Sequence, residues 1–252
     1  MNKEDIQEAS KILFEHRLNK TGLNSLKNLE PQTIDEAYAI QDNLKLRYLE
    51  LKDNICIGKK IGATSLTAQE VLNMNEPFYG NLYSRYSLIN AKKLHAKNFF
   101  EPYAEPEISF RIKEDIDLLL DGLVCSIEIN DFRFAKPLPE IGARNVISTN
   151  GASEFWLRNE KIYNINDVNL SDLEVTLYID NKIMDSGNTK NVLNNPLNAA
   201  LWLINNLAKK GETLLKGQFI SSGSCTKPSK IYSGNHIKAK FEQLEDIEFQ
   251  FI

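Results

Sequence analysis

The sequence predicts an α+β protein in which a helical N-terminal section packs on a mixed, mostly antiparallel β structure. Helical periodicity fills the first 54 residues, short β-like runs begin near residue 55, and one strong helix interrupts them near residue 200. Strands and helices do not alternate regularly, which excludes a doubly wound fold, and no internal repeat is present. We therefore predict a single domain over residues 1–252, with a helical section (1–54) and a β-rich section (55–252).

Two helices are expected in the N-terminal section. Residues 5–20 place apolar side chains on one helix face: Ile6, Ala9, Ile12 and Leu13. In the second helix, Thr33 and Glu36 have the spacing of a capping box. Its apolar positions also recur at helical intervals: Ala37, Ile40, Leu44 and Tyr48.

The β-rich section is predicted from short runs of apolar and β-branched residues separated by turn residues. These runs are residues 56–63, 86–91, 106–112, 124–129, 173–180, 218–223, 236–242 and 247–251.

The interrupting helix has clear start and stop signals. Asn195 is the expected N-cap, Pro196 occupies the first helical position, and Gly211 follows lysines in the last turn. An apolar face that should pack on a sheet is formed by Leu197, Leu201, Ile204 and Leu207.

Composition narrows the functional class. A net charge of -4 without a basic stripe argues against nucleic-acid binding. No apolar run approaches the roughly 20 residues that span a bilayer, and the polar start is not a signal peptide. The three cysteines are isolated, as in a reducing compartment. We therefore expect a cytoplasmic protein that binds neither membrane nor nucleic acid.

Three glutamates on two predicted strands are the strongest chemical signal. Glu105 and Glu107 share one strand face, and Glu128 points away from the apolar side of the next strand. Carboxylates brought together repel one another unless a cation lies among them. Oxygen ligands with positions left open for water favour Mg²⁺ or Mn²⁺. The alternative is that all three are solvated residues on half-exposed strands.

The order of several motifs resembles one known family. The motifs are TIDEAYAIQ, GKKIGATS, EPFYGNL, EPEISF, SIEINDFRF and NPLNAALWLINNLAKKGETLLKGQFISSGSCT. This order is similar to that of the 2-keto-4-pentenoate hydratase and 4-oxalocrotonate decarboxylase family, within the fumarylacetoacetate hydrolase superfamily. The resemblance runs from about Thr33 to the C-terminus.

The resemblance implies a fold, a metal site and an active-site lysine. The fold is the fumarylacetoacetate hydrolase C-terminal-domain type, preceded by a helical section and assembled as a homo-oligomer, with a complex with a related pathway enzyme also open. The metal ligands fall on Glu105, Glu107 and Glu128, and the cofactor is Mg²⁺ or Mn²⁺. The motif lysine falls on Lys60, not on Lys59. We expect Lys60 to supply positive charge and transfer protons, with a pKa depressed by desolvation.

Four further residues are candidates for binding a substrate carboxylate or an attacking water. Arg133 can form a fork with a carboxylate, although a structural salt bridge is an open alternative. Asn150 and the turn hydroxyls of Ser222 and Ser224 are the other candidates, with an ordinary strand-end turn as the alternative for the serines.

Two positions depart from the family pattern. Phe78 and Thr149 stand where many members carry acids. These changes spare the three glutamates but predict a site that is poorer in proton carriers and more apolar. A substrate with an apolar tail is the favoured consequence, and slow turnover of the usual small diacids is the alternative.

The resemblance implies a metal-dependent lyase that acts on a short 2-oxo acid or its dienol, in the catabolism of aromatic compounds. Hydration of a 2-hydroxy-2,4-dienoate to a 4-hydroxy-2-oxo acid is the leading hypothesis. Decarboxylation of a 2-oxo-enedioate is the nearest rival, and hydrolysis of an acylpyruvate is disfavoured because no His-Glu pair is apparent. A hypothesis of another class is a catalytically weakened subunit that binds metal and a 2-oxo acid.

Overall fold

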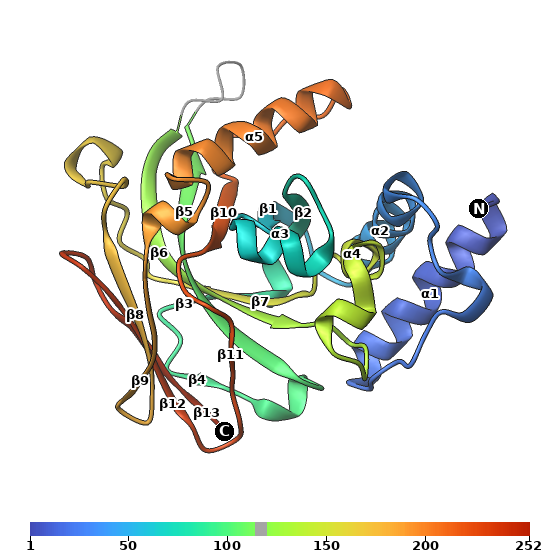
Figure 1. Ribbon diagram of the computed structural model, residues 1–252, viewed down its shortest axis with the longest axis horizontal. Helices are drawn as coiled ribbons and strands as arrows, with labels where there is room; N and C mark the ends of the chain where they lie inside the picture. Colours follow the sequence, from blue (N-terminus) through green and yellow to red (C-terminus); the bar gives the residue numbers. More distant parts are fainter. Residues whose placement is uncertain (114–119) are drawn as a thin grey trace.

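The computed structural model describes residues 1–113 and 120–252, and Figure 1 shows two sheets with helices beside and above them. The larger sheet has the strand order β2-β1-β10-β5-β6-β7-β3, and β11 pairs with β5. Its strands are β1 (Cys56–Gly62), β2 (Phe78–Tyr83), β3 (Ser87–Ile89), β5 (Pro102–Ile112), β6 (Leu120–Asp131), β7 (Ser153–Arg158), β10 (Phe219–Ser224) and β11 (Ser229–Lys230). The second sheet has the order β4-β13-β12-β8-β9. Its strands are β4 (Lys93–Leu94), β8 (Glu174–Ile179), β9 (Lys182–Asn188), β12 (His236–Phe241) and β13 (Ile247–Phe251).

The pairing is mixed and mostly antiparallel, as predicted. Parallel pairs join β1 to β10, β3 to β7 and β4 to β13, whereas β5 and β6 form a long antiparallel pair. The α-helices are α1 (Lys3–Asn19), α2 (Ile34–Leu49), α3 (Leu66–Leu72), α4 (Leu138–Ser148) and α5 (Pro196–Lys209). Short 3-10 helices lie between them: η1 (Lys27–Leu29), η2 (Ser84–Tyr86), η3 (Ala96–Asn98), η4 (Ile165–Asp167) and η5 (Thr189–Asn191).

The two N-terminal helices form where the sequence predicts them. The Thr33 hydroxyl accepts a hydrogen bond from the Glu36 backbone N–H at 3.1 Å, which is the first half of the capping box. The Glu36 carboxylate accepts from the backbone N–H of Gln32 at 2.7 Å instead of from Thr33. All four predicted core positions of α2 are buried: Ala37, Ile40, Leu44 and Tyr48.

The larger sheet has one apolar face and one face with polar side chains. Ile108 and Phe110 of β5 and Ile127 of β6 belong to a core that also contains residues of the second sheet and of α5. On the other side, helices α1, α2 and α4 share a second core with Phe78 of β2. In Figure 1 these helices lie to the right of the larger sheet, and the second sheet lies to the left. The polar face of β5 and β6 therefore looks toward the helical part of the molecule.

The predicted apolar face of α5 is partly wrong. Leu207 is buried, but Leu201 is 56% exposed. The helix instead packs through the smaller residues Ala199 and Ala200 together with Leu203. Small side chains let the helix axis approach the sheet, so the buried stripe is rotated relative to the stripe of largest residues.

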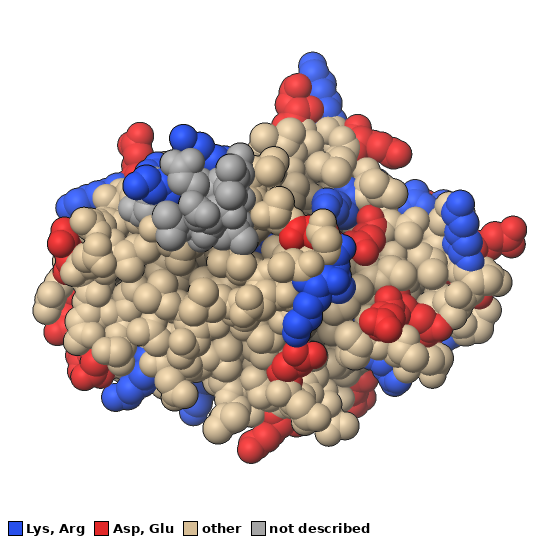
Figure 2. All heavy atoms as spheres, turned by 90° about the horizontal axis from the view of Figure 1, so that it is seen from above, with Lys and Arg blue, Asp and Glu red and all other residues tan. Residues whose placement is uncertain are grey.

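Among the described residues, no helix is both long and apolar enough to cross a membrane. Figure 2 shows one face of the molecule, on which basic and acidic side chains are interspersed around a broad uncharged area. That face carries no large patch of a single charge sign.

Candidate metal centre and cavity

The three glutamates come together because their strands are neighbours. Glu105 of β5 lies directly opposite Glu128 of β6, and Glu107 is two residues along on the same face as Glu105. One carboxylate oxygen from each residue lies within 4.8 Å of the others. Glu107 and Glu128 are fully buried, and Glu105 is partly buried. The cluster that the strand pattern predicts is therefore present.

Lys60 joins this cluster from β1. Its ammonium Nζ lies 3.1 Å from Glu128 Oε2 and donates a hydrogen bond to the Gly151 carbonyl at 3.0 Å. Three strand spacings of about 4.8 Å separate β1 from β6, so this contact requires long side chains that converge on the concave side of a curved sheet. Lys59 points to the opposite face, where its ammonium donates to Asn81 Oδ1 at 2.9 Å. Both lysines are buried, but only Lys60 reaches the carboxylates.

The carboxylates have oxygen atoms that no other group satisfies. Within the described chain, Glu107 Oε1 and Glu128 Oε1 are buried without a hydrogen-bond partner, and Glu128 Oε2 contacts only the Lys60 ammonium. Buried carboxylate oxygens without partners are strongly unfavourable. A divalent cation would satisfy them and would bring the cluster with Lys60 to electrical neutrality. The donor set therefore fits a hard ion such as Mg²⁺ or Mn²⁺.

The pKa shifts of the clustered residues are consistent with a site for a hard cation. Burial raises the pKa of Glu105 to about 7, the Lys60 ammonium opposes this shift, and Glu128 adds to it. Burial and the charge of Glu128 raise the pKa of Glu107 well above its usual range. Burial lowers the pKa of Lys60, but the three carboxylates outweigh this effect and leave its pKa raised. Without a bound metal, the three anions around the ammonium keep its pKa raised, and the depression expected for Lys60 beside a bound metal stays a prediction.

Stabilisation by a divalent ion should grow as the pH rises from 5 to 7.5. Without the ion, the folded protein holds protons on Glu105 that the unfolded chain, with a carboxyl pKa near 4.5, releases. The free energy of unfolding of the metal-free protein should therefore fall as the pH rises through this interval. Binding of the ion requires ionised carboxylates, so its contribution increases over the same interval. Melting temperatures measured in Mg²⁺ and in EDTA at each pH test this, and a constant difference would contradict it.

Buried hydroxyl groups form a hydrogen-bonded chain that ends at the Glu107 carboxylate. Ser221 Oγ of β10 donates a short hydrogen bond to Glu107 Oε2, and the Gly223 N–H donates to the same oxygen at 3.2 Å. Ser221 Oγ lies 2.9 Å from Ser109 Oγ, which accepts from the Trp156 indole N–H at 3.3 Å. Since the indole can only donate, Ser109 Oγ accepts from it and has its own proton for Ser221 Oγ or for Ser126 Oγ, which lies 2.7 Å away. The chain thus fixes Oε2 and leaves Oε1 for an ion.

Ser221→Ala should weaken Mn²⁺ binding by roughly 10–100-fold, the usual effect of removing a hydrogen bond that orients a metal ligand. Ser222→Ala is the matched control, because Ser222 is equally buried but its hydroxyl donates to the Ile108 carbonyl at 2.8 Å. Isothermal titration with Mn²⁺ measures both. Equal affinities in the two variants would show that Ser221 does not orient Glu107.

A cavity of about 120 Å³, here called the inner cavity, opens beside Lys60 and Glu105. Phe78 lines it, and the Lys60 ammonium lies 5.4 Å from the centre of the Phe78 ring. Gly62 and Gly151 face this ring, and a Cβ at either position would meet it at less than 3.0 Å. The Phe78 side chain, at a position where the resemblance implies an acid in many family members, therefore forms part of the cavity wall. Asn130, which is not among the predicted site residues, also lines the cavity and lies two residues beyond Glu128.

Arg133 does not face the carboxylates. Its guanidinium lies 3.1 Å from Glu154 and 3.4 Å from Asp131, and it donates to the Asn98 carbonyl. Arg17 of α1 pairs with the same Glu154 at 3.0 Å. Arg133 therefore forms a structural salt bridge, which was the open alternative to binding a substrate carboxylate. The cause is local, since Arg133 adopts a left-handed backbone conformation with φ 60°, which turns its side chain from the strand direction.

The other predicted substrate-binding residues do not all line the inner cavity. Asn150 is buried, and its amide exchanges hydrogen bonds with the Asn81 backbone N–H at 2.8 Å and carbonyl at 2.9 Å, which fixes the turn next to Gly151. Ser224 lines the inner cavity, whereas Ser222 does not. Thr149 donates to the Val146 carbonyl and lines a different, small cavity beside Arg17. The expected effect of Thr149 on the site is therefore wrong, and only Phe78 alters the inner cavity.

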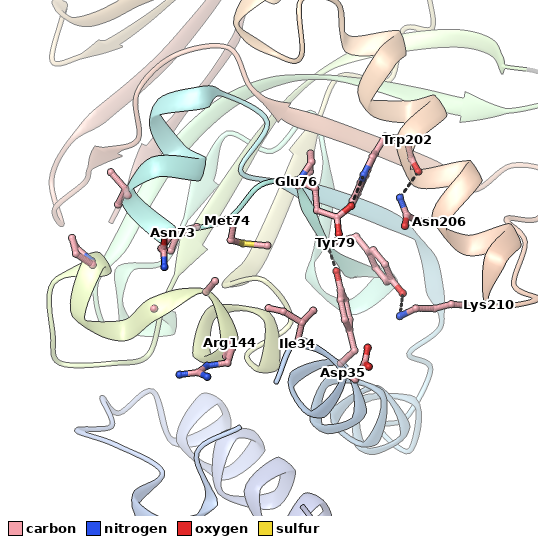
Figure 3. A pocket seen from close by; sticks show the side chains of 17 residues that line it. Ile34, Asp35, Asn73, Met74, Glu76, Tyr79, Arg144, Trp202, Asn206 and Lys210 are labelled. Atoms are coloured by element: carbon pink, nitrogen blue, oxygen red, sulfur yellow. Dashed lines mark hydrogen bonds between the residues drawn. The ribbon is translucent and has the colours of Figure 1, made fainter. Parts of the chain in front are cut away.

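The largest described cavity, about 630 Å³, lies elsewhere (Figure 3). Its walls include Tyr79, whose hydroxyl accepts from Lys210 at 2.9 Å, and Trp202, whose indole N–H donates to Glu76. Leu72 of α3 lines both this cavity and the inner cavity. None of the three clustered glutamates lines the larger cavity, whereas Glu105 lines the inner cavity.

Comparison with known proteins is consistent with the site. No family model matches the chain. The chain is 24% identical over its whole length to 98% of a 4-oxalocrotonate decarboxylase from Pseudomonas putida. It is 25% identical, over 86% of its length and 85% of the relative, to 2-keto-4-pentenoate hydratase 1 from Dechloromonas aromatica. Over most of its length, the chain is therefore similar to 2-keto-4-pentenoate hydratases and 4-oxalocrotonate decarboxylases.

Solved structures of other proteins share the fold of this chain. The 4-oxalocrotonate decarboxylase from Pseudomonas putida G7, complexed with magnesium and adipate, has a TM-score of 0.93 at 23% identity over 100% of this chain and 99% of that chain. Fumarylpyruvate hydrolase from Pseudomonas aeruginosa, in complex with Mn²⁺ and pyruvate, has a TM-score of 0.61 at 10% identity over 77% of this chain and 88% of that chain. The chain therefore shares its fold with both of these solved structures.

Proposed function

We propose that the protein is a divalent-metal-dependent lyase that hydrates a 2-hydroxy-2,4-dienoate to a 4-hydroxy-2-oxo acid. The single observation that carries this proposal is the cluster of Glu105, Glu107 and Glu128 with partnerless buried oxygens, closed on one side by Lys60. Relatives named as hydratases and as a decarboxylase support the reaction class. A bound Mg²⁺ or Mn²⁺ would supply Lewis acidity to the 2-oxo acid head of the substrate.

The residues of the chain would bind the substrate and move protons. Lys60 holds a proton at Nζ between Glu128 and the Gly151 carbonyl, and this position lies at the wall of the inner cavity. In the proposed reaction the substrate's 2-hydroxyl loses its proton, carbons 3 and 5 each gain one, and hydroxide from water adds at carbon 4. The sum is one water molecule. Because Lys60 already holds its proton, its proposed role is to donate a hydrogen bond to the 2-oxygen and to stabilise negative charge there, while the proton that leaves this oxygen passes to water.

Decarboxylation of a 2-oxo-enedioate is the second candidate. It is favoured by the full-length match to the decarboxylase and by the TM-score of 0.93 to the enzyme from the G7 strain. Both reactions develop negative charge on the 2-oxygen of the substrate, so a cation held by the carboxylate cluster would serve either one. The distinction rests on the part of the cavity that receives the rest of the substrate.

Assays with 2-hydroxypenta-2,4-dienoate and with 2-oxohex-3-enedioate, each in Mg²⁺ and in EDTA, test the proposal. Hydration is expected to be metal-dependent and faster than loss of CO₂. Metal binding without turnover of either compound would support instead a catalytically weakened subunit. We also propose a homo-oligomer located in the cytoplasm, and light scattering of the purified protein tests its assembly.

A further inference from the structure

Asn130 of β6 has a buried acceptor atom without a partner in the protein. The residue lines the inner cavity and is only 3% exposed. Among the described residues, no group donates a hydrogen bond to its amide oxygen Oδ1. Because a buried amide oxygen without a partner is unfavourable, this atom points to a donor that comes from outside the chain.

The orientation of the Asn130 amide follows from its neighbour Glu105. Burial raises the pKa of Glu105 to about 7, and a side-chain hydrogen bond from Asn130 partly opposes this shift. A hydrogen bond that lowers a carboxyl pKa favours the ionised form, which can only accept, so the amino group Nδ2 is the donor. Since Nδ2 is engaged by Glu105, Oδ1 is the atom left for a ligand.

The strand pattern places Asn130 just beyond the clustered carboxylates. The pairing of β6 with β5 is regular at this point, with Glu128 opposite Glu105 and Asn130 opposite Tyr103. Residues two apart share one face of a strand, and their Cα atoms lie about 6.6 Å apart. A ligand with its head group at the carboxylates and its other atoms in the inner cavity therefore lies beside Asn130.

Two hydroxyls of the same cavity wall also offer a ligand acceptor atoms. Ser224 donates its proton to the Thr226 carbonyl at 2.8 Å, and the Thr226 hydroxyl donates to the Lys227 carbonyl at 3.3 Å. Both hydroxyls, like Asn130 Oδ1, are therefore left with lone pairs. A carboxylate at this part of the wall would find no proton donor among these three groups, whereas a hydroxyl or a water molecule supplies the missing proton.

We propose that Asn130 Oδ1 holds the water molecule that adds to carbon 4 of the substrate, and afterwards the 4-hydroxyl of the product. This inference rests on the proposed function and assigns a positioning residue to it. Once carbon 5 is protonated, a double bond joins carbons 3 and 4. The water oxygen bonds to carbon 4, the electron pair of that double bond moves toward the 2-oxygen, and one water proton leaves to solvent. Carbon 3 then takes a proton from solvent as the 2-oxo group re-forms, and the amide itself takes none.

Binding of two unreactive acids tests the amide oxygen without turnover. 2-Hydroxypentanoate and 2,4-dihydroxypentanoate share a head group that chelates a metal ion, and neither loses water because carbon 3 is not acidic. Calorimetry in saturating Mg²⁺ should show that one configuration at carbon 4 binds roughly 3–10-fold more tightly than the acid without the 4-hydroxyl, the effect of one hydrogen bond. Asn130→Leu should abolish this preference. Any effect of the variant through Glu105 changes both affinities alike, so it cancels in their ratio.

Thr226→Val is the matched control, because it removes a hydroxyl of the same wall whose proton is already bonded within the chain. This variant should keep the preference for the 4-hydroxyl. Mn²⁺ should still bind to Asn130→Leu, although more weakly, because the variant loses the hydrogen bond to Glu105. Complete loss of Mn²⁺ binding would identify Oδ1 as a metal ligand and would overturn the proposal.

Two rates separate this inference from the proposed reaction. Asn130→Leu should slow hydration of 2-hydroxypenta-2,4-dienoate by roughly 10²-fold, the effect of a misplaced reactant. Exchange of the carbon 3 hydrogens of 2-oxopentanoate for deuterium should be nearly unchanged, because it needs no water at carbon 4. If no dienoate is hydrated but the 4-hydroxyl preference depends on Asn130, the reaction is wrong and the hydroxyl site stands. A preference that is absent from the original protein or survives in Asn130→Leu, or equal losses of hydration and exchange, overturns the role of Asn130.

Discussion

Lys60→Met should lower turnover of 2-hydroxypenta-2,4-dienoate by roughly 10²–10⁴-fold, the usual range for loss of a general acid–base group. The ammonium of Lys60 lies 3.1 Å from Glu128 and is the cation within reach of the carboxylates among the described residues. Methionine has a similar length and an apolar tip, so the cavity wall keeps its shape. Affinity for Mn²⁺ should be retained, because the three carboxylates remain. Steady-state kinetics together with Mn²⁺ titration separate these effects.

Lys59→Met is the control for Lys60→Met, and the contacts of Lys59 indicate which effect to expect. Lys59 is not an exposed lysine but donates to Asn81, which in turn holds the turn that contains Asn150. Its loss should therefore lower the melting temperature while turnover per folded molecule falls by less than tenfold. Equal losses of turnover at the two positions would show that positive charge in general, and not a positioned group, matters.

Glu107→Gln should abolish stabilisation by Mg²⁺. An ion that binds only the folded state at one hundred times its Kd contributes about 2.7 kcal/mol. For a chain of this length that corresponds to a rise of roughly 5–10 °C in Tm. Glutamine keeps the size of the side chain but removes the charge, and it places an amide where an ionised oxygen is needed. Thermal unfolding with Mg²⁺ and with EDTA measures the difference.

Glu154→Gln is the matched control, because Glu154 is equally buried but pairs with Arg17 and Arg133 outside the cluster. This variant should lower the Tm in both conditions and keep the difference caused by Mg²⁺. A Mg²⁺ shift that survives in Glu107→Gln, or one that is lost in Glu154→Gln, would contradict the assignment of the metal ligands.

The sequence predicts the helices and strands whose apolar residues fall on one face. The strands that carry Glu107 and Glu128 alternate cleanly between apolar and polar residues, and both form as expected. β2 was not predicted because all six of its residues are buried, so it has no alternation to detect. The polar edge strand β9 also lacks an apolar face, and the helix α4 is interrupted at Gly142, which has φ 73°.

The residues of the site divide in the same way: a local pattern predicts some of their contacts, and the pairing of distant strands determines the others. Strand alternation is enough to group the glutamates, but the contact between Lys60 and Glu128 depends on the order of four strands, which no local pattern contains. The sequence predicts Ser222 and not Ser221 as a site residue, although Ser221 is the residue that contacts Glu107. The pairing of β10 with β5 shifts between Ser221 and Ser224, and such a bulge breaks the count of alternating side chains.

The ion pairs of Glu154 bear on how far the chain can be shortened. Helix α1 contributes no residue that lines the inner cavity, so the β-rich section invites use as a minimal enzyme. Removing α1 would delete Arg17 and open the burial of Glu154, and breaking a buried ion pair costs about 3–5 kcal/mol. Gln41 of α2 likewise donates to the carbonyls of Tyr79 in β2 and of Ile147 in α4, and so joins these two elements. Gene fusions and library designs should therefore treat the N-terminal helices as part of the catalytic unit and leave them joined to it.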